Sequence, residues 1–361
     1  MAPATDSNNM LNNSLLTLEK LTLVIPSFER QDYLVRQINY WKDKNISLAI
    51  LDGSRFPLDL EKRLAFDIGQ FSIRYFHLPV SIEERMGFVL DKIQTKYAAL
   101  LSDDEFFLPH SLISCIKYLD ANVDSVSCKG RALGFTWKNG RVMAREVYPS
   151  LADCRVNSFD PEERLIQHFS PYQMITLWSV LRADIFIKTV KAIAFSGKYK
   201  TAAAAELQVS LVAAYSGKCM VLDELMWMRS FENKNIWWND GCLSFEDWYL
   251  DPKNILEVNR FFEAIVHALG FENPPGREFL MPFRNALEVY CNSCRKPARP
   301  SFILRLLRLF RRLISRVLCI SDRSWKMLRL AVREIEEQQI VVSREDLDEV
   351  ELTVMHYHQS V

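Results

Sequence analysis

The chain has 361 residues, 49% of them hydrophobic and 25% charged, and its formal net charge is zero. This composition is typical of a globular protein, long enough for one large domain or two small ones. The balanced charge gives no reason to expect nucleic acid as a partner, and no uncharged apolar run is long enough for a membrane-spanning helix.

The cysteines and the N-terminal stretch suggest a cytoplasmic protein. Only Cys291 and Cys294 form a C-x-x-C pair, which is weak evidence for zinc without a second pair or nearby histidines. The other cysteines lie in apolar surroundings typical of reduced core residues. Residues 1–18 are rich in Asn and Ser and are expected to be a disordered leader. They contain no basic start followed by an apolar core, so no secretory signal is predicted.

From residue 19 onward, short apolar runs alternate with amphipathic segments. The apolar runs cover residues 21–26, 46–54, 71–78 and 97–102, and the segments with helical spacing cover 30–44, 57–68 and 81–95. Four strands that alternate with three helices predict an α/β fold, an open and mostly parallel sheet with helices on both faces.

The pattern changes in the second half of the chain. Residues 125–148 alternate around Asn139-Gly140, which predicts a hairpin. Helices are expected at 160–169 and 201–217, and further helices outside the sheet follow up to residue 294.

Polar and acidic residues follow three of the predicted strands. Pro26-Ser27-Phe28-Glu29-Arg30 follows the first strand, Asp52-Gly53-Ser54 the second, and Ser102-Asp103-Asp104-Glu105 the fourth. Ligands of parallel α/β sheets bind beyond these carboxyl ends. Adjacent carboxylates at a partly desolvated strand end are costly unless a cation neutralises them, so a metal, a basic partner or an ordinary solvated turn are the three explanations.

Four stretches resemble a known family. "LTLVIPSFERQDYLVRQI", "LAILDGS", "ERMGFVLDKIQTKYAALLSDDEFFLPHSL" and "AAAAELQVSLVAAYSGK" occur in the order found in family 2-like glycosyltransferases of the GT-A fold. The resemblance covers roughly residues 21–229. It implies an inverting enzyme that transfers a sugar from a nucleotide-sugar donor to a hydroxyl of a glycan or a lipid-linked acceptor, often in bacterial envelope pathways.

The resemblance also implies a Mg²⁺ or Mn²⁺ cofactor. A cation on the donor diphosphate absorbs the charge that develops on the leaving oxygens, and carboxylates are suitable ligands. Asp104 is expected to ligate the metal, and Asp103 to ligate it or to contact the ribose. Ser102 stands where the family has the first acid, and Glu105 has the weakest case, as a solvated neighbour.

The donor-binding residues implied by the resemblance are Pro26, Ser27, Phe28, Arg30, Asp52, Arg85 and Asp103. Phe28 would flank the base and Arg30 would meet a phosphate. Each also has a purely structural interpretation: Phe28 as a core residue, Arg30 as a solvated helix start and Asp52 as a turn-forming residue beside Gly53.

Glu206 is the expected catalytic base. Inverting transfer requires a base that takes the proton of the acceptor hydroxyl. Counted back from Gly217, Glu206 falls on the second acid of the family's Glu-Asp pair, and Ala205 takes the place of the first. A surface glutamate on an Ala-rich helix is the alternative interpretation, and Asp223 or Glu224 is the next candidate base.

Two further features concern the acceptor side and the C-terminal region. Trp237, Trp238 and Trp248 are candidates for stacking on sugars or for packing between domains. Residues 302–318 form a basic amphipathic pattern that fits an anionic membrane surface or a helix docked on the body. We expect a glycosyltransferase domain at 19–235, a helical subdomain at 236–296, and a basic helix with an acidic tail at 297–361.

Two other functions remain open. A catalytically silent GT-A-like glycan-binding protein would explain Ser102 and Ala205, which stand where the family has acids. A sugar nucleotidylyltransferase is disfavoured, because such an enzyme needs a Gly-rich phosphate loop after the first strand and "VIPSFERQ" contains no glycine.

Overall fold

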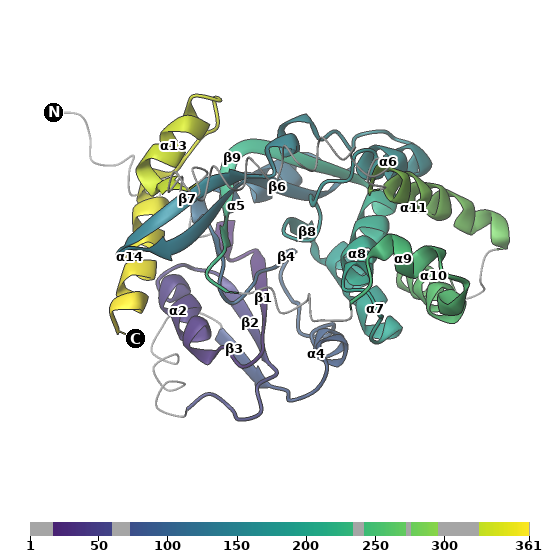
Figure 1. Ribbon diagram of the computed structural model, residues 1–361, viewed down its shortest axis with the longest axis horizontal. Helices are drawn as coiled ribbons and strands as arrows, with labels where there is room; N and C mark the ends of the chain where they lie inside the picture. Colours follow the sequence, from purple (N-terminus) through teal and green to yellow (C-terminus); the bar gives the residue numbers. More distant parts are fainter. Residues whose placement is uncertain (1–16, 60–72, 234–241, 272–275, 295–324, 361) are drawn as a thin grey trace, which may run out of the picture.

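The computed structural model describes residues 17–59, 73–233, 242–271, 276–294 and 325–360. The described residues form a mixed sheet covered by helices on both faces (Figure 1), which confirms the predicted fold class. The strands are β1 (Leu21–Ser27), β2 (Ser47–Asp52), β3 (Ile73–His77), β4 (Tyr97–Leu100), β5 (Phe106–Phe107), β6 (Ser125–Lys138), β7 (Arg141–Val147), β8 (Val180–Arg182), β9 (Lys218–Ser230) and β10 (Lys326–Met327). The α-helices are α2 (Gln31–Trp41), α4 (Ile82–Phe88), α5 (Pro109–Ala121), α6 (Pro161–Phe169), α7 (Ala183–Ser196), α8 (Ala203–Ser216), α9 (Phe245–Leu250), α10 (Ile255–Leu269), α11 (Met281–Cys294), α13 (Leu328–Glu336) and α14 (Arg344–Ser360).

The first half of the sheet is parallel, in the order β4-β1-β2-β3. Side chains of a strand point alternately to its two faces. Leu23 and Ile25 of β1 therefore join the core beneath α2 and α5, and Val24 joins the core beneath α4 and α7. Burial on both faces explains why β1, β2 and β4 are apolar runs in the sequence, whereas β3, at the end of the strand order, is only half-buried and contains Arg74 and His77.

The second half of the sheet adds antiparallel pairs. β8 pairs antiparallel with both β4 and β6, and β6 forms a hairpin with β7. The turn residues Asn139 and Gly140 have φ angles of 54° and 72°, as the Asn-Gly signal predicts. β9 returns parallel to β6 and also pairs with the short strand β5, which follows the acidic cluster.

Several helix predictions need adjustment. The helix expected at 81–95 ends at Phe88, and a capping box between Ser81 and Glu84 begins it, as the sequence indicates. The segment 57–68 was predicted as helical, but residues 57–59 are not helical and the remainder lies outside the described residues. No described helix is both long enough and apolar enough to span a membrane.

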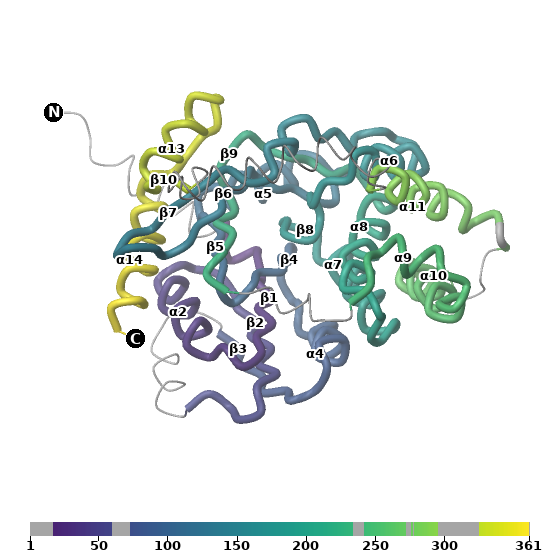
Figure 2. The backbone as a smooth tube through the Cα atoms, viewed as in Figure 1, coloured from purple at the N-terminus to yellow at the C-terminus, as the bar shows by residue number. Residues whose placement is uncertain are grey.

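The C-terminal helices return to the start of the chain. α14 packs against α2 and β7, and α13 packs against β7 (Figure 2). Most of the predicted leader and the basic segment 302–318 lie outside the described residues, whereas Leu18 is buried in the core. α9–α11 share a core with α6–α8, and the division at 236–296 stays a prediction.

Candidate active site

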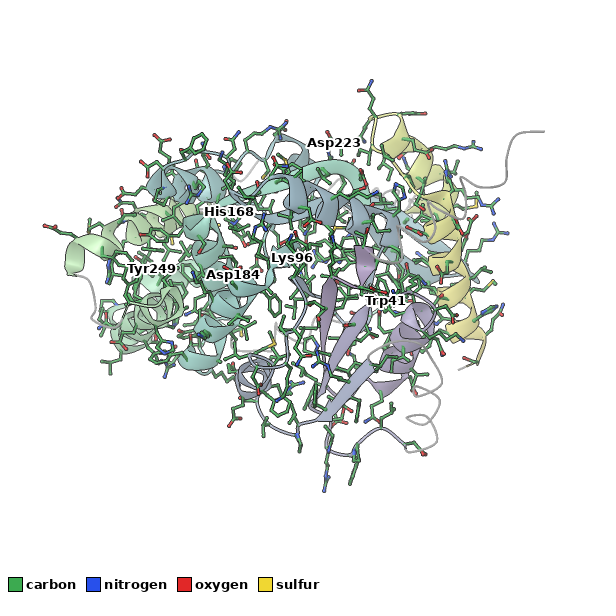
Figure 3. The ribbon with its side chains drawn as sticks, turned by 180° about the vertical axis from the view of Figure 1, so that it is seen from behind. Trp41, Lys96, His168, Asp184, Asp223 and Tyr249 are labelled. Carbon is green, nitrogen blue, oxygen red and sulfur yellow. The ribbon has the colours of Figure 1, made fainter. Side chains whose placement is uncertain are left out.

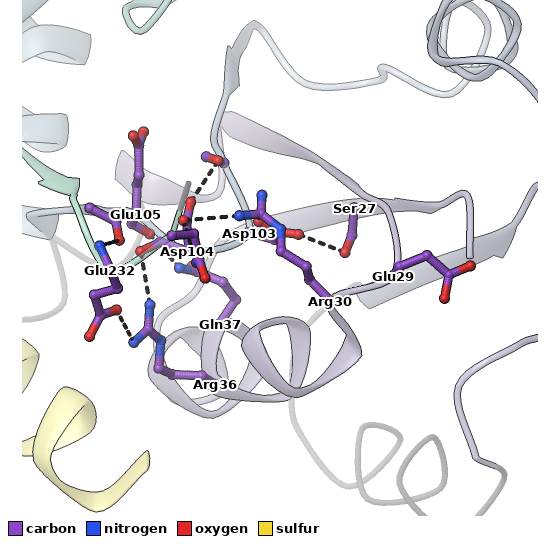
Figure 4. A network of polar contacts seen from close by, with 12 residues as sticks. Ser27, Glu29, Arg30, Arg36, Gln37, Asp103, Asp104, Glu105 and Glu232 are labelled. Atoms are coloured by element: carbon purple, nitrogen blue, oxygen red, sulfur yellow. Dashed lines mark hydrogen bonds and ion pairs between the residues drawn. The ribbon is translucent and has the colours of Figure 1, made fainter. Parts of the chain in front are cut away.

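Asp103 and Asp104 lie beside the loop that follows β1, because β1 and β4 are neighbouring parallel strands. The guanidinium of Arg30 forms ion pairs with both acids, 2.5 Å from Oδ1 of Asp103 and 3.1 Å from Oδ2 of Asp104 (Figure 4). The hydroxyl of Ser27 donates to Oδ2 of Asp103 at 2.7 Å. Two carboxylates therefore converge on one positive charge at the carboxyl edge of the sheet.

Asp104 has further partners from distant parts of the chain. Its Oδ1 accepts a hydrogen bond from the Ser102 hydroxyl at 2.9 Å, and its Oδ2 accepts one from the Asn233 amide at 2.9 Å. Its backbone carbonyl accepts from Arg36 at 2.8 Å. Ser102, a poor metal ligand, here orients the carboxylate that follows it by two residues.

Burial controls the charge of this cluster. It raises the pKa of Asp103 to about 7, although Arg30 favours the charged form. Glu105 is also buried, which corrects the expectation of a solvated neighbour, and burial raises its pKa to about 8. Its Oε2 accepts the indole N–H of Trp227 at 2.8 Å, so Glu105 belongs to the interior beneath the site.

The donor set fits a hard divalent cation in part. Carboxylate oxygens are the ligands that Mg²⁺ and Mn²⁺ prefer, and such ions are often held by one or two carboxylates plus substrate phosphates. Within the described ranges no group of three or more His, Cys, Asp or Glu side chains is placed to hold a metal. A cation on Asp103 and Asp104 would therefore need donor phosphates to complete its shell, and it would compete with Arg30.

Asp52 and Arg85 brace the edge of the sheet. Asp52 is fully buried and accepts from the Ser54 backbone at 2.9 Å, from Tyr75 at 2.6 Å and from Gln31 at 2.9 Å. Burial would raise the pKa of Asp52, but these hydrogen bonds hold it below the usual value. Arg85 donates to the backbone carbonyls of Ser27, the last residue of β1, and Leu51, near the end of β2, so Asp52 and Arg85 both hold this edge of the sheet in place.

Pro26 and Phe28 differ in exposure. Pro26 lies in β1 opposite Leu51, whereas Phe28 exposes 48% of its surface just beyond the strand. A large exposed ring next to Arg30 is available to stack on a planar ligand. The structure thus brings every predicted donor-side residue to one edge of the sheet.

Glu206 lies in the first turn of α8, half-buried, away from the acidic cluster in the sequence. The Tyr172 hydroxyl donates to its Oε1 at 2.6 Å, and burial raises its pKa. Lys129 interacts electrostatically with both Glu206 and Glu105. A half-buried carboxylate with an elevated pKa is suited to general-base chemistry.

Lys129 was missed by sequence reasoning. It is fully buried in β6, donates to the backbone carbonyl of Met174 at 2.9 Å, and lies 4.2 Å from the ring centroid of Trp227. Burial lowers its pKa to about 7. A charged lysine within the apolar sequence at the start of β6 could have indicated a functional residue. Nothing in the sequence pattern singled out Tyr172 or Asn233.

Two sequence hypotheses are corrected or weakened. Trp248 is fully buried and donates to Glu257 at 2.8 Å, so it packs between helices and is closed to sugars. Trp237 and Trp238 lie outside the described residues. Asp223, an alternative candidate for the catalytic base, is exposed and pairs with Arg131 at 3.2 Å. In Figure 3 Asp223 lies at the upper edge of the molecule, whereas His168 lies in its interior.

No family model and no curated protein matches the chain. Among solved structures, residues 1–349 of S. aureus TarS give 13% identity and a TM-score of 0.45, with 76% of this chain and 81% of that chain covered. The same protein in complex with UDP-GlcNAc gives 12% identity and a TM-score of 0.44, with 75% of this chain and 80% of that chain covered. Glucosyl-3-phosphoglycerate synthase from Mycobacterium tuberculosis, in complex with Mn²⁺, UDP and glucosyl-3-phosphoglycerate, gives 11% identity and a TM-score of 0.37. The match covers 76% of this chain and 88% of that chain. Likenesses of this size do not decide between functions.

Proposed function

We propose that the chain is an inverting glycosyltransferase that moves a sugar from a nucleotide-sugar to a hydroxyl of a glycan or a lipid-linked acceptor. The observation that carries this proposal is the convergence of Asp103 and Asp104 on one cation position, beside Arg30 and the exposed ring of Phe28. A nucleoside diphosphate offers a base for the ring and phosphates for the cationic site.

Arg30 takes two roles in this proposal. Without donor, its guanidinium neutralises the two buried carboxylates, which would otherwise repel each other. Asp104 and Asp103 would hold a divalent cation, and Arg30 would then be free to bind a phosphate oxygen through its planar fork. The bound Mg²⁺ or Mn²⁺ supplies stabilisation of the charge that develops on the leaving diphosphate.

Glu206 is the proposed base. Its Oε2 accepts the proton of the acceptor hydroxyl while that oxygen attacks the anomeric carbon from the face opposite the leaving phosphate. Tyr172 holds the other oxygen and fixes the direction of the carboxylate. The small neighbours Ala202, Ala203 and Ala205 leave room for an acceptor.

The alternative is a GT-A-like glycan-binding protein without activity, which Ser102 and Ala205 favour. Hydrolysis of a nucleotide-sugar in the presence of Mn²⁺ separates the two. An enzyme releases nucleoside diphosphate slowly even without acceptor, and Asp104→Ala removes this release. Glycan binding with no hydrolysis of any donor would instead support the binding protein.

The basic segment 302–318 is proposed to place the enzyme on the inner face of the membrane. Each basic residue near an anionic surface contributes about 1 kcal/mol, so binding to anionic vesicles should be strong and salt-sensitive. The measurement is co-sedimentation of the intact chain against a variant with Arg305, Arg308, Arg312 and Arg316 replaced by glutamine, because truncation before this segment would also remove α13 and α14, which pack on α2 and β7. Equal pelleting of both would contradict membrane contact and favour a soluble acceptor.

A further inference from the structure

Glu232 lies just beyond the end of β9, and the mechanism above does not use it. Its side chain exposes only 3% of its surface. The oxygen Oε2 accepts a hydrogen bond from Arg36 of α2 at 2.8 Å (Figure 4). The oxygen Oε1 lies 2.6 Å from Nε2 of His358 in α14. A carboxylate only accepts hydrogen bonds, so Nε2 of His358 is the donor. Glu232 therefore joins two helices that are far apart in the sequence.

Arg36 connects Glu232 to the donor-side acids. Its guanidinium is buried and donates through Nη1 to Glu232 and through Nη2 to the backbone carbonyl of Asp104, each at 2.8 Å. Three aromatic rings surround the guanidinium carbon, with centroids at 4.6, 5.1 and 5.0 Å: those of Tyr33, Phe106 and Tyr357. An arginine presents its donors in a rigid planar fork. The place of Glu232 therefore determines how Arg36 meets the carbonyl of Asp104.

The residue after Glu232 reaches the same acid directly. The side-chain amide of Asn233 donates to Oδ2 of Asp104 at 2.9 Å. The backbone N–H of Glu232 donates to the hydroxyl of Ser230 at 3.2 Å, so Glu232 is held by its backbone as well as by its side chain. Its position determines where the chain places Asn233. Asp104 is thus held at its carbonyl through Arg36 and at its carboxylate through Asn233, and both contacts depend on Glu232.

The C-terminal helix α14 supplies the second partner of Glu232. The ring of His358 stacks on Trp137 of β6, with centroids 5.0 Å apart and planes 3° from parallel. The ring of the preceding residue, Tyr357, packs on Tyr33 of α2 at 4.9 Å between centroids. These two contacts fix the last turn of α14 and hold the imidazole of His358 in place against Glu232. The helix is therefore linked to the acidic site by a chain of hydrogen bonds.

We propose that Glu232 is a positioning residue for Asp104, and that His358 makes α14 part of the support of the donor site. The inference rests on the proposed function, because it assigns Asp104 to the metal and the donor diphosphate. Groups that hydrogen-bond to a metal ligand orient it, and their loss weakens metal binding about 10- to 100-fold. Glu232 acts on Asp104 through Arg36 and Asn233, so its loss should weaken metal binding by about tenfold.

The first test measures the order of the acidic loop by hydrogen exchange of the intact chain without any ligand. Glu232→Gln keeps the size of the side chain and removes its charge. The amides of residues 102–105 should exchange several-fold faster in this variant, because the loop opens more often, and those of β2 should be unchanged. Glu349→Gln is the matched control, since Glu349 of α14 pairs with Lys44 beyond the end of α2. Equal exchange of residues 102–105 in wild type and Glu232→Gln, or equal acceleration in the control, would overturn the proposal.

The second test measures Mn²⁺ binding by calorimetry. Glu232→Gln should bind Mn²⁺ about tenfold more weakly than the wild type, and Glu349→Gln should bind it equally well. Unchanged Mn²⁺ affinity in Glu232→Gln would overturn the proposal. A wild type that binds neither Mn²⁺ nor any nucleotide-sugar would contradict the proposed function. Faster exchange of residues 102–105 in Glu232→Gln would in that case still support the positioning of Asp104.

A second variant tests the part played by α14. His358→Phe keeps a ring that can stack on Trp137 and removes the donor to Glu232. It should change hydrogen exchange and Mn²⁺ affinity in the same direction as Glu232→Gln but by less, because Arg36 still holds Glu232. Folding of both variants is checked by circular dichroism. Wild-type exchange and Mn²⁺ affinity in His358→Phe would overturn the role of α14 and, if Glu232→Gln does not fold, the whole proposal.

Discussion

Replacement of Lys129 by methionine should change how stability depends on pH. Lys129 is fully buried, and burial lowers its pKa from the usual lysine value of 10.5 to about 7. The unfolded chain therefore binds one more proton than the folded chain between these two values. Since stability rises with pH wherever the unfolded state binds more protons, Lys129 makes the wild type more stable as the pH rises through this window.

The size of this pH dependence follows from how far the pKa of Lys129 is lowered. One pKa unit corresponds to about 1.4 kcal/mol, so a single group with these two pKa values adds about 2 kcal/mol to the free energy of unfolding between pH 7 and pH 9. Lys129→Met removes this gain. It also removes a positive charge that favours the ionised forms of Glu105 and Glu206. The resulting rise of both pKa values makes the variant lose further stability as the pH rises.

The assay is urea unfolding of the wild type and Lys129→Met at several pH values from 6.5 to 9.5, a range that spans the lowered pKa of about 7. The stability of the wild type minus that of the variant should increase with pH by about 2 kcal/mol or more. Lys191→Met is the matched control on an exposed lysine of α7 and should show the pH dependence of the wild type. Parallel pH profiles for wild type and Lys129→Met would refute the reasoning.

Four further predictions concern the proposed chemistry. Glu206→Gln should keep donor affinity and lose transfer by about two to four orders of magnitude in a steady-state assay, and normal turnover would place the base elsewhere. Tyr172→Phe removes a hydrogen bond that lowers the pKa of Glu206, so the acid limb of the transfer pH profile should move to higher pH; an unmoved limb would contradict this role. Asp104→Ala should abolish Mn²⁺-dependent donor binding, measured by calorimetry, with the circular dichroism spectrum unchanged. Arg30→Ala should bind Mn²⁺ alone more tightly than the wild type, because the competing cation is gone, but bind donor more weakly; weaker binding of Mn²⁺ alone would contradict the competition.

The parallel half of the fold was predictable from the sequence. Three of its strands, β1, β2 and β4, are apolar runs bounded by polar residues, and the alternation of strands with helical segments predicts that they run parallel. The antiparallel half was less predictable. β9 pairs parallel with β6 although the two strands are far apart in the chain, and such long-range pairing leaves no local pattern.

The residues of the candidate site likewise divide into those that the local sequence predicts and those that depend on long-range packing. Arg30 and the acids of residues 103–104 were predictable as neighbours, because they follow strands that lie side by side. The burial of Glu105 was not, since its partner Trp227 lies 122 positions away. Lys129 was missed for a similar reason: its electrostatic interactions with Glu105 and Glu206 depend on how segments far apart in the chain pack near β6.

The most direct test of the account is a thermal-shift screen of nucleotide-sugars with and without Mn²⁺. A ligand at a hundred times its dissociation constant stabilises the folded state by about 2.7 kcal/mol, which corresponds to about 3 to 4 °C for a chain of this length. We predict a shift of this size for at least one donor, only with the metal, and none for Asp104→Ala. No shift with any nucleotide-sugar, or an equal shift in the variant, would contradict a donor site built on Asp103 and Asp104.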